Sequence, residues 1–191
     1  MREIRPLAIL DYDSSWPARF EAIAHDLRSR VGSAATTIDH IGSTSVPGLA
    51  AKDIIDIQVT VLDLDAADAW PHELIDGVVR TQRGTSQDHV PPDNSDTHHW
   101  AKHFWSGSSA HIHVREFGRL NQRYALLFRD FLRAHQAAAD AYGTLKRALA
   151  TAARGDWDAY YAVKDPACDL IIAGAEEWAL RTAWTPGRPH G

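Results

Sequence analysis

Residues 39–61, DHIGSTSVPGLAAKDIIDIQVTV, decide the fold expected for this chain. Segment 54–61 alternates strictly, which is typical of a β-strand with one buried face. Asp56 and Gln58 lie on the face opposite the apolar one, which carries Ile55, Ile57, Val59 and Val61. An isolated charge is strongly disfavoured in a protein core. Asp56 therefore predicts a strand face that looks into a solvated cleft or binds a cation.

A loop of small residues precedes this strand. The backbone N–H groups and hydroxyls of Gly42, Ser43 and Thr44 could approach an anion closely, as in phosphate-binding loops. The alternative is a polar turn whose Ser and Thr hydroxyls cap a helix. The combination of the Gly-Ser pair with Asp56 on the next strand favours the phosphate site.

The composition is that of an ordinary globular protein. The 191 residues are 45% hydrophobic and 24% charged, with a formal net charge of −5. These values predict one compact domain, or one domain with a helical extension. The acidic balance argues against an extended nucleic-acid-binding surface.

The cysteine content and the hydropathy indicate the compartment. Cys168 is the single cysteine, which excludes an internal disulfide and a cysteine-based zinc cluster. We find no apolar stretch of the length of a signal-peptide core or a membrane span. We therefore expect a cytoplasmic protein that does not enter a membrane, and the sequence leaves its oligomeric state open.

The order of the predicted elements indicates the fold class. Strands and helices alternate over about residues 1–118, and helices alone follow over about 119–182, so we expect an α/β or α+β core with a helical C-terminal part and a disordered tail at 183–191. Within this single domain, 63–76 predicts a helix, and Pro166 predicts the start of the last helix. The polar loop 83–102 is long enough to predict a functional or mobile segment such as a lid.

A second alternating strand is predicted over 110–117. His111, His113 and Arg115 share one of its faces. A His-x-His pair on a strand can chelate a metal ion, but it can also form a polar face that is hydrogen-bonded to its neighbours. Spacing alone does not decide between these two interpretations.

Basic residues recur in the helical part. Arg129 and Arg133 lie one turn apart, a spacing that suits phosphate oxygens or a carboxylate. Ion pairing with Asp130, Glu116 or solvent is the alternative. Lys146 and Lys164 each follow aromatic residues, in YGTLK and YYAVK.

Residues 40–59, HIGSTSVPGLAAKDIIDIQV, resemble the signature of the GrpB family, small bacterial proteins similar to the nucleotidyltransferase superfamily. The segments DYDSSWPARFEAIAHDLR, AHIHVRE, FRDFLRAH, YGTLKRALA and YYAVK extend the likeness over roughly residues 7–180. The resemblance implies a nucleotidyltransferase-like small mixed sheet flanked by helices, with the site between the sheet and the helical part.

The resemblance also implies roles for individual residues. In the superfamily, Gly-Ser is followed by Asp-x-Asp/Glu on the next strand, and a third carboxylate comes from a later strand; these carboxylates hold a divalent metal against a nucleoside triphosphate. Gly42, Ser43 and Asp56 match this pattern. Gln58 stands in place of the second carboxylate, we find no clear third, and a neutral amide adds no charge toward holding Mg²⁺.

Three functions follow as hypotheses. The first is transfer of a nucleotidyl group from a nucleoside triphosphate to an unknown acceptor, assisted by Mg²⁺ or Mn²⁺, with Asp56, Ser43 and Gln58 at the reacting centre and with Asp56, His111 and His113 as metal ligands. The phosphates would contact Gly42, Ser43, Thr44, Lys52, Arg115, Arg129, Arg133, Lys146 and Lys164. The second is a catalytically degenerate module that binds a nucleotide or a partner protein. The third is a metal hydrolase that uses the two histidines with Asp56.

Overall fold

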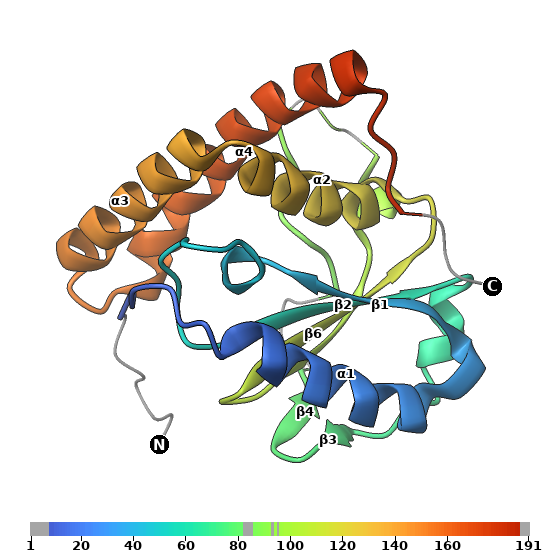
Figure 1. The fold of residues 1–191 in the computed structure, drawn as a ribbon. Helices are drawn as coiled ribbons and strands as arrows, with labels where there is room; N and C mark the ends of the chain where they lie inside the picture. Colours follow the sequence, from blue (N-terminus) through green and yellow to red (C-terminus); the bar gives the residue numbers. More distant parts are fainter. Residues whose placement is uncertain (1–7, 82–85, 93, 95, 188–191) are drawn as a thin grey trace.

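The fold was analysed in a computed structural model, which describes residues 8–81, 86–92, 94 and 96–187 (Figure 1). Its centre is a six-stranded sheet with the strand order β1-β2-β6-β5-β4-β3. The strands are β1 (Ala35–Ile41), β2 (Ile55–Val61), β3 (Glu73–Ile75), β4 (Val78–Arg80), β5 (His103–Ser106) and β6 (Ala110–Glu116). β2 and β6 pair in parallel, and the other neighbours pair antiparallel. The expected mixed sheet is confirmed.

Helices cover both faces of this sheet. α1 (Trp16–Val31) lies against one face, and α2 (Leu120–Ala134), α3 (Gln136–Ala153) and α4 (Trp157–Thr182) lie on the other side (Figure 1). Short 3-10 helices interrupt the connections at Gly32–Ala34, Ser43–Ser45, Leu64–Ala67 and Thr97–Trp100. The mixed α/β class and the helical C-terminal part are as expected.

The alternation of apolar and polar residues in β2 gives the sheet one face that packs in the core and one face that is polar. The apolar face of β2 packs against α1 in one core cluster, in which Trp16, Leu27, Ile55 and Ile57 are each 0% exposed. Burial of such side chains stabilises the folded chain by roughly 1.5–3 kcal/mol each. Asp56 and Gln58 consequently point toward the C-terminal helices, where a cavity forms.

Two sequence-based element assignments are wrong. Residues 63–76 form a 3-10 turn and then strand β3 rather than a helix, because Pro71 cannot donate a helical hydrogen bond. Pro166 does not begin a helix but lies inside α4. The chain tolerates it there because Pro166 and Ala162, whose carbonyl loses its helical partner, are both exposed to water.

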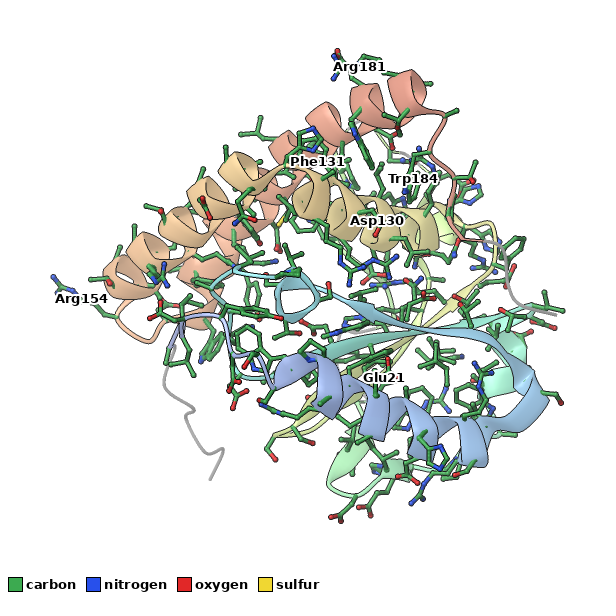
Figure 2. The ribbon with its side chains drawn as sticks, viewed as in Figure 1. Glu21, Asp130, Phe131, Arg154, Arg181 and Trp184 are labelled. Carbon is green, nitrogen blue, oxygen red and sulfur yellow. The ribbon has the colours of Figure 1, made fainter. Side chains whose placement is uncertain are left out.

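The beginning of the expected disordered tail packs against α2. The Trp184 indole N–H donates to Asp130 Oδ2 at 3.1 Å (Figure 2), and the ring packs beside Leu127 and Ala175. Residues 188–191 of that tail lie outside the described residues. None of the helices in the described ranges combines the length and the hydropathy needed to cross a bilayer.

The complete burial of Ile57 predicts a large loss of stability when its side chain is shortened. Ile57→Ala should lower the free energy of unfolding by about 2–5 kcal/mol, because it removes buried methyl groups from the centre of the sheet. Leu180→Ala on α4 is the matched control, since Leu180 is 83% exposed and its loss should change stability by less than about 0.5 kcal/mol. Urea titration of both variants measures the difference, and equal losses would contradict this assignment of the core.

Candidate functional site

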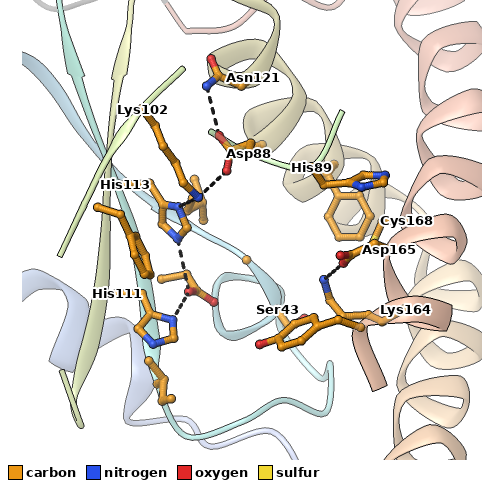
Figure 3. Close-up of a pocket in the computed structure, with 18 of the residues that line it drawn as sticks. Ser43, Asp88, His89, Lys102, His111, His113, Asn121, Lys164, Asp165 and Cys168 are labelled. Atoms are coloured by element: carbon orange, nitrogen blue, oxygen red, sulfur yellow. Dashed lines mark hydrogen bonds and ion pairs between the residues drawn. The ribbon is translucent and has the colours of Figure 1, made fainter. Parts of the chain in front are cut away.

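A cavity of about 1080 Å³ lies between the polar face of the sheet and the C-terminal helices (Figure 3). One wall is formed by the sheet and carries His111, His113 and Lys102. The facing wall carries Lys164 and Asp165 of α4 (Figure 3). The volume is at the upper end of the range of small-molecule sites. The cavity therefore lies between the sheet and the helical part, where the resemblance implied a site.

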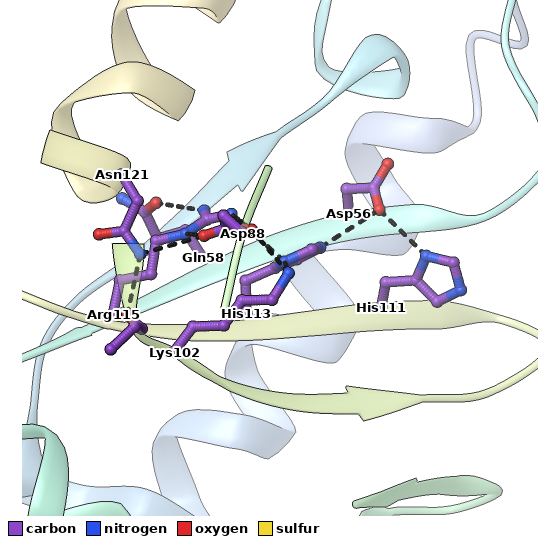
Figure 4. Close-up of polar contacts among 9 residues, drawn as sticks. Asp56, Gln58, Asp88, Lys102, His111, His113, Arg115 and Asn121 are labelled. Atoms are coloured by element: carbon purple, nitrogen blue, oxygen red, sulfur yellow. Dashed lines mark hydrogen bonds and ion pairs between the residues drawn. The ribbon is translucent and has the colours of Figure 1, made fainter. Parts of the chain in front are cut away.

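The parallel pairing of β2 and β6 brings Asp56 beside the two histidines. Asp56 is in register with His111, and Gln58 is in register with His113. The Oδ1 atom of Asp56 lies 3.3 Å from His111 Nδ1 and 3.8 Å from His113 Nε2 (Figure 4). The three expected metal-binding side chains thus come together on one wall of the cavity.

The neighbours of His113 fix its tautomer. Its Nδ1 atom faces the Lys102 ammonium at 3.2 Å and the Arg115 guanidinium at 3.3 Å (Figure 4). Both cations can only donate hydrogen bonds. The Nδ1 atom must therefore accept, and Nε2 carries the proton on the side of Asp56.

Burial and neighbouring charges keep Asp56 ionised and His113 neutral. Burial acts to raise the pKa of Asp56, but the neighbouring imidazoles of His111 and His113 outweigh it and hold the pKa well below its usual range. Burial, with the charges of Lys102 and Arg115, lowers the pKa of His113 to about 3. At neutral pH the sheet wall thus presents an ionised carboxylate next to a neutral imidazole.

The Gln58 side chain forms its hydrogen bonds within the protein interior and is not among the residues that line the cavity. Its side chain is 0% exposed. The Oε1 atom accepts a hydrogen bond from Arg115 at 2.7 Å, and Nε2 donates to the Gln122 carbonyl at 3.3 Å. The structure therefore separates Gln58 from Asp56, although both lie on the same strand face.

Asp88, Lys102 and Asn121 complete the sheet wall, and sequence reasoning did not single them out. Asp88 Oδ1 lies 2.6 Å from Lys102 Nζ, and Oδ2 accepts from Asn121 at 3.0 Å and from Arg115 at 2.8 Å (Figure 4). Burial acts to raise the pKa of Asp88, but the charges of Arg115 and Lys102 hold it far below its usual value. The available signal was a carboxylate in the long polar loop that was expected to be functional.

The Gly-Ser loop lines the cavity next to Asp56. Gly42 has φ +67°, and a Cβ atom there would lie 2.5 Å from Asp56 Oδ2, so only glycine fits. Ser43 Oγ lies 2.7 Å from Lys146 Nζ. Thr44 Oγ1 lies 2.9 Å from the Nε2 atom of His40, whose burial is the main cause of a pKa near 4.

Arg129 and Arg133 lie behind this loop and are not among the residues that line the cavity. Arg129 donates to the His40 carbonyl at 3.1 Å, and Arg133 donates to the Ser45 carbonyl at 2.9 Å. Arg129 also pairs with Asp130, as the alternative interpretation expected. The two arginines thus fasten α2 to the backbone of the loop.

The remaining expected cations do line the cavity. Lys52 Nζ donates to Tyr161 Oη at 2.8 Å and lies 5.0 Å from the Trp157 ring centroid. Lys164 Nζ lies 3.0 Å from Asp165 Oδ1 (Figure 3). Lys146 of α3 is buried, and its Nζ atom lies beside Ser43.

The implied Mg²⁺ does not fit this arrangement as a paired-carboxylate site. Mg²⁺ takes oxygen ligands, whereas the donors beside Asp56 are imidazole nitrogens. The cations Lys102 and Arg115 behind His113 oppose a second positive charge. In the part of the chain that the structure describes, no group of three or more His, Cys, Asp or Glu is arranged to hold a metal ion.

Comparisons with known proteins agree with the resemblance. A family model described as GrpB protein matches residues 6–173. The chain is similar to the crystal structure of conserved protein GrpB from Enterococcus faecalis, with a TM-score of 0.74 and 30% sequence identity. That alignment covers 90% of this chain and 99% of the other.

Curated relatives carry two kinds of name. A protein named dephospho-CoA kinase from Mycolicibacterium paratuberculosis is 35% identical over 198 residues, covering 95% of this chain and 49% of the relative. A UPF0157 protein from Halalkalibacterium halodurans is 34% identical over 155 residues, covering 78% and 73%. The chain spans about half the length of the first relative, so the kinase name describes a larger protein.

The close approach of Gly42 to Asp56 makes a testable prediction. Gly118 also has a positive φ, +82°, but nothing lies within 4 Å of a Cβ atom there. Gly118→Ala should therefore lose only the backbone strain, about 1–2 kcal/mol. Gly42→Ala should lose more, because the methyl group must displace Asp56. Urea unfolding of the two variants compares them, and equal destabilisation would show that Gly42 is needed for its backbone alone.

Proposed function

The chain belongs to the GrpB family, and we propose that its cavity binds a nucleoside phosphate. The charge of the cavity carries this proposal. Among the described residues that line it, six are lysine or arginine and three are aspartate, in a chain whose formal net charge is −5. A cationic cleft in an acidic protein concentrates an anionic ligand.

Lys52 is the best-placed cation for a phosphate. Its contacts are the Tyr161 hydroxyl and two aromatic rings, and no carboxylate of the described residues pairs with it. On the sheet wall, by contrast, Lys102 and Arg115 already share Asp88. A phosphate oxygen would supply the missing counter-charge of Lys52, and a hydrogen bond to a charged group contributes about 1.5–3 kcal/mol.

Aromatic side chains supply a surface for the base. Tyr161 lines the helix wall and Phe104 lines the sheet wall, and both are partly exposed. Aromatic rings favour offset stacking on flat apolar groups. A nucleobase against these rings and phosphates near Lys52 would use both kinds of surface.

Nucleotide binding is tested by calorimetry and thermal shift. A panel of nucleoside triphosphates, with dephospho-CoA added because of the name of one relative, should raise the melting temperature of the unmodified protein. Lys52→Met should weaken the binding of the best ligand by about 10- to 150-fold, the loss of one charged hydrogen bond.

Arg181→Met is the matched control, because Arg181 is exposed at the far end of α4 (Figure 2) and its loss should leave affinity unchanged. The melting temperature of each free variant shows whether it is folded. Absence of binding by any phosphorylated ligand to the folded unmodified protein would contradict the proposal.

A second candidate is nucleotidyl transfer assisted by Mg²⁺ or Mn²⁺. The position of Asp56 in the cavity beside the Gly-Ser loop favours it, although Asp56, His111 and His113 do not form a metal-holding group of three among the described residues. The contacts of Gln58 argue for binding without turnover, because the amide that replaces the second carboxylate is held by Arg115 away from the cavity. Binding is therefore our primary proposal, and transfer to an unknown acceptor is the alternative.

Two substitutions on β2 separate these candidates. If Mn²⁺ binds at Asp56, calorimetry should detect binding of added Mn²⁺ to the unmodified protein and no binding to Asp56→Asn. Gln58→Glu should not tighten Mn²⁺ binding, because the new carboxylate stays paired with the Arg115 guanidinium. Pyrophosphate release from any triphosphate by the unmodified protein would instead favour the transferase. Tighter Mn²⁺ binding by Gln58→Glu would show that Arg115 does not hold residue 58 away from the metal.

A further inference from the structure

A serine and a buried lysine meet at the edge of the cavity. Lys146 Nζ lies 2.7 Å from Ser43 Oγ and also donates to the Ala50 carbonyl oxygen. Its Nζ atom also lies 4.5 Å from the centroid of the Tyr142 ring. Lys146 is 2% exposed, and no carboxylate of the described residues forms an ion pair with it.

We propose that Ser43 is a nucleophile and Lys146 is its general base, acting on a phosphoanhydride bond of the nucleotide bound in the cavity. The substrate rests on the proposed function above, whereas the activation of Ser43 does not. A serine hydroxyl attacks slowly unless an adjacent base removes its proton, and a neutral amine within hydrogen-bond reach can do so.

The surroundings of Lys146 favour the neutral amine. An ammonium that is buried without a carboxylate loses its hydration and gains no counter-charge. Burial is the largest cause that lowers the pKa of Lys146, to about 7, and the charges of Lys164 and Lys52 lower it further, while Cys168 and Asp56 act in the other direction. The amine lone pair is therefore available near neutral pH, and it can face Ser43 while an N–H remains on Ala50.

The reaction balances with the groups present. A bond forms between Ser43 Oγ and phosphorus as the bond from phosphorus to the bridging anhydride oxygen breaks. The electron pair of the broken bond leaves with that oxygen, and the serine proton moves to Lys146 Nζ. When water or another acceptor then attacks the phosphorus, the bond from Ser43 Oγ to phosphorus breaks and the Lys146 ammonium returns its proton to Ser43 Oγ. The proton of the attacking group passes to solvent. Lys52 lines the same cavity, and its ammonium neutralises the negative charge of the leaving phosphate.

The first test needs no nucleotide. Diisopropyl fluorophosphate should form one adduct at Ser43, by a new Oγ–P bond with loss of fluoride, found by intact mass and peptide mapping. Ser43→Ala should form none. Lys146→Met should react about 100-fold more slowly, the lower end of the contribution of a general base. Arg147→Met is the matched control on α3, since Arg147 is paired with Asp11 outside the cavity and should react at the unmodified rate.

The pH profile of the unmodified protein gives a second measurement that does not depend on any variant folding. The labelling rate should rise with pH and level off above about 7, because Lys146 must lose its proton to act. Absence of a Ser43 adduct, an unchanged rate in folded Lys146→Met, or a rate that rises only near the ordinary lysine pKa of about 10.4 would overturn the dyad.

Radiolabelled ATP distinguishes this proposal from nucleotide binding itself. Label from the α-phosphorus at Ser43 indicates a nucleotidyl-serine, and label from the γ-phosphorus indicates a phosphoserine. If the fluorophosphate labels Ser43 but no nucleotide binds, the proposed function is wrong and the dyad remains. If nucleotides bind but Ser43 accepts no group from either reagent, the dyad is wrong and the binding function remains.

Discussion

The ion pair between Arg115 and Asp88 is the interaction on which the sheet wall of the cavity depends. The guanidinium contacts Asp88 at 2.8 and 3.0 Å and Gln58 at 2.7 Å, while the same carboxylate holds Lys102 and Asn121. This network joins β2, β6, α2 and the segment that carries Asp88. Loss of one partner from a buried pair destabilises a protein by about 3–5 kcal/mol. The segment expected to be a mobile lid is thus fixed to the wall at Asp88.

The sequence predicted those features that depend on local periodicity. The two faces of β2 and the His-x-His face of β6 follow from side-chain spacing, and the structure places Asp56, His111 and His113 on the cavity side and the apolar face of β2 in the core. It could not predict Asp88, because the partners of Asp88 are distant in the sequence and are defined only by the tertiary fold. It also could not show that α4 continues through Pro166, since that depends on which helix face meets water.

Residue type alone did not decide the use of the basic side chains. A guanidinium donates equally well to phosphate oxygens and to backbone carbonyls, and Arg129 and Arg133 donate to the carbonyls of His40 and Ser45. Gln58 is a similar case. Its position matches a superfamily carboxylate, but its amide can both accept from Arg115 and donate to a carbonyl. A carboxylate could only accept, so the amide suits this buried place better.

The charge of the two walls then indicates where an anion would bind. On the sheet wall, Asp88 offsets Lys102 and Arg115, and Asp56 adds an ionised carboxylate, so that wall offers little net attraction to phosphate. On the facing wall, Lys52 has neutral partners, burial favours the neutral amine of Lys146, and Lys164 has a carboxylate beside it. Because a cation without a counter-charge gains most from an anionic ligand, phosphates should lie against the helices. Asp56 and the histidines would then face the other end of the ligand.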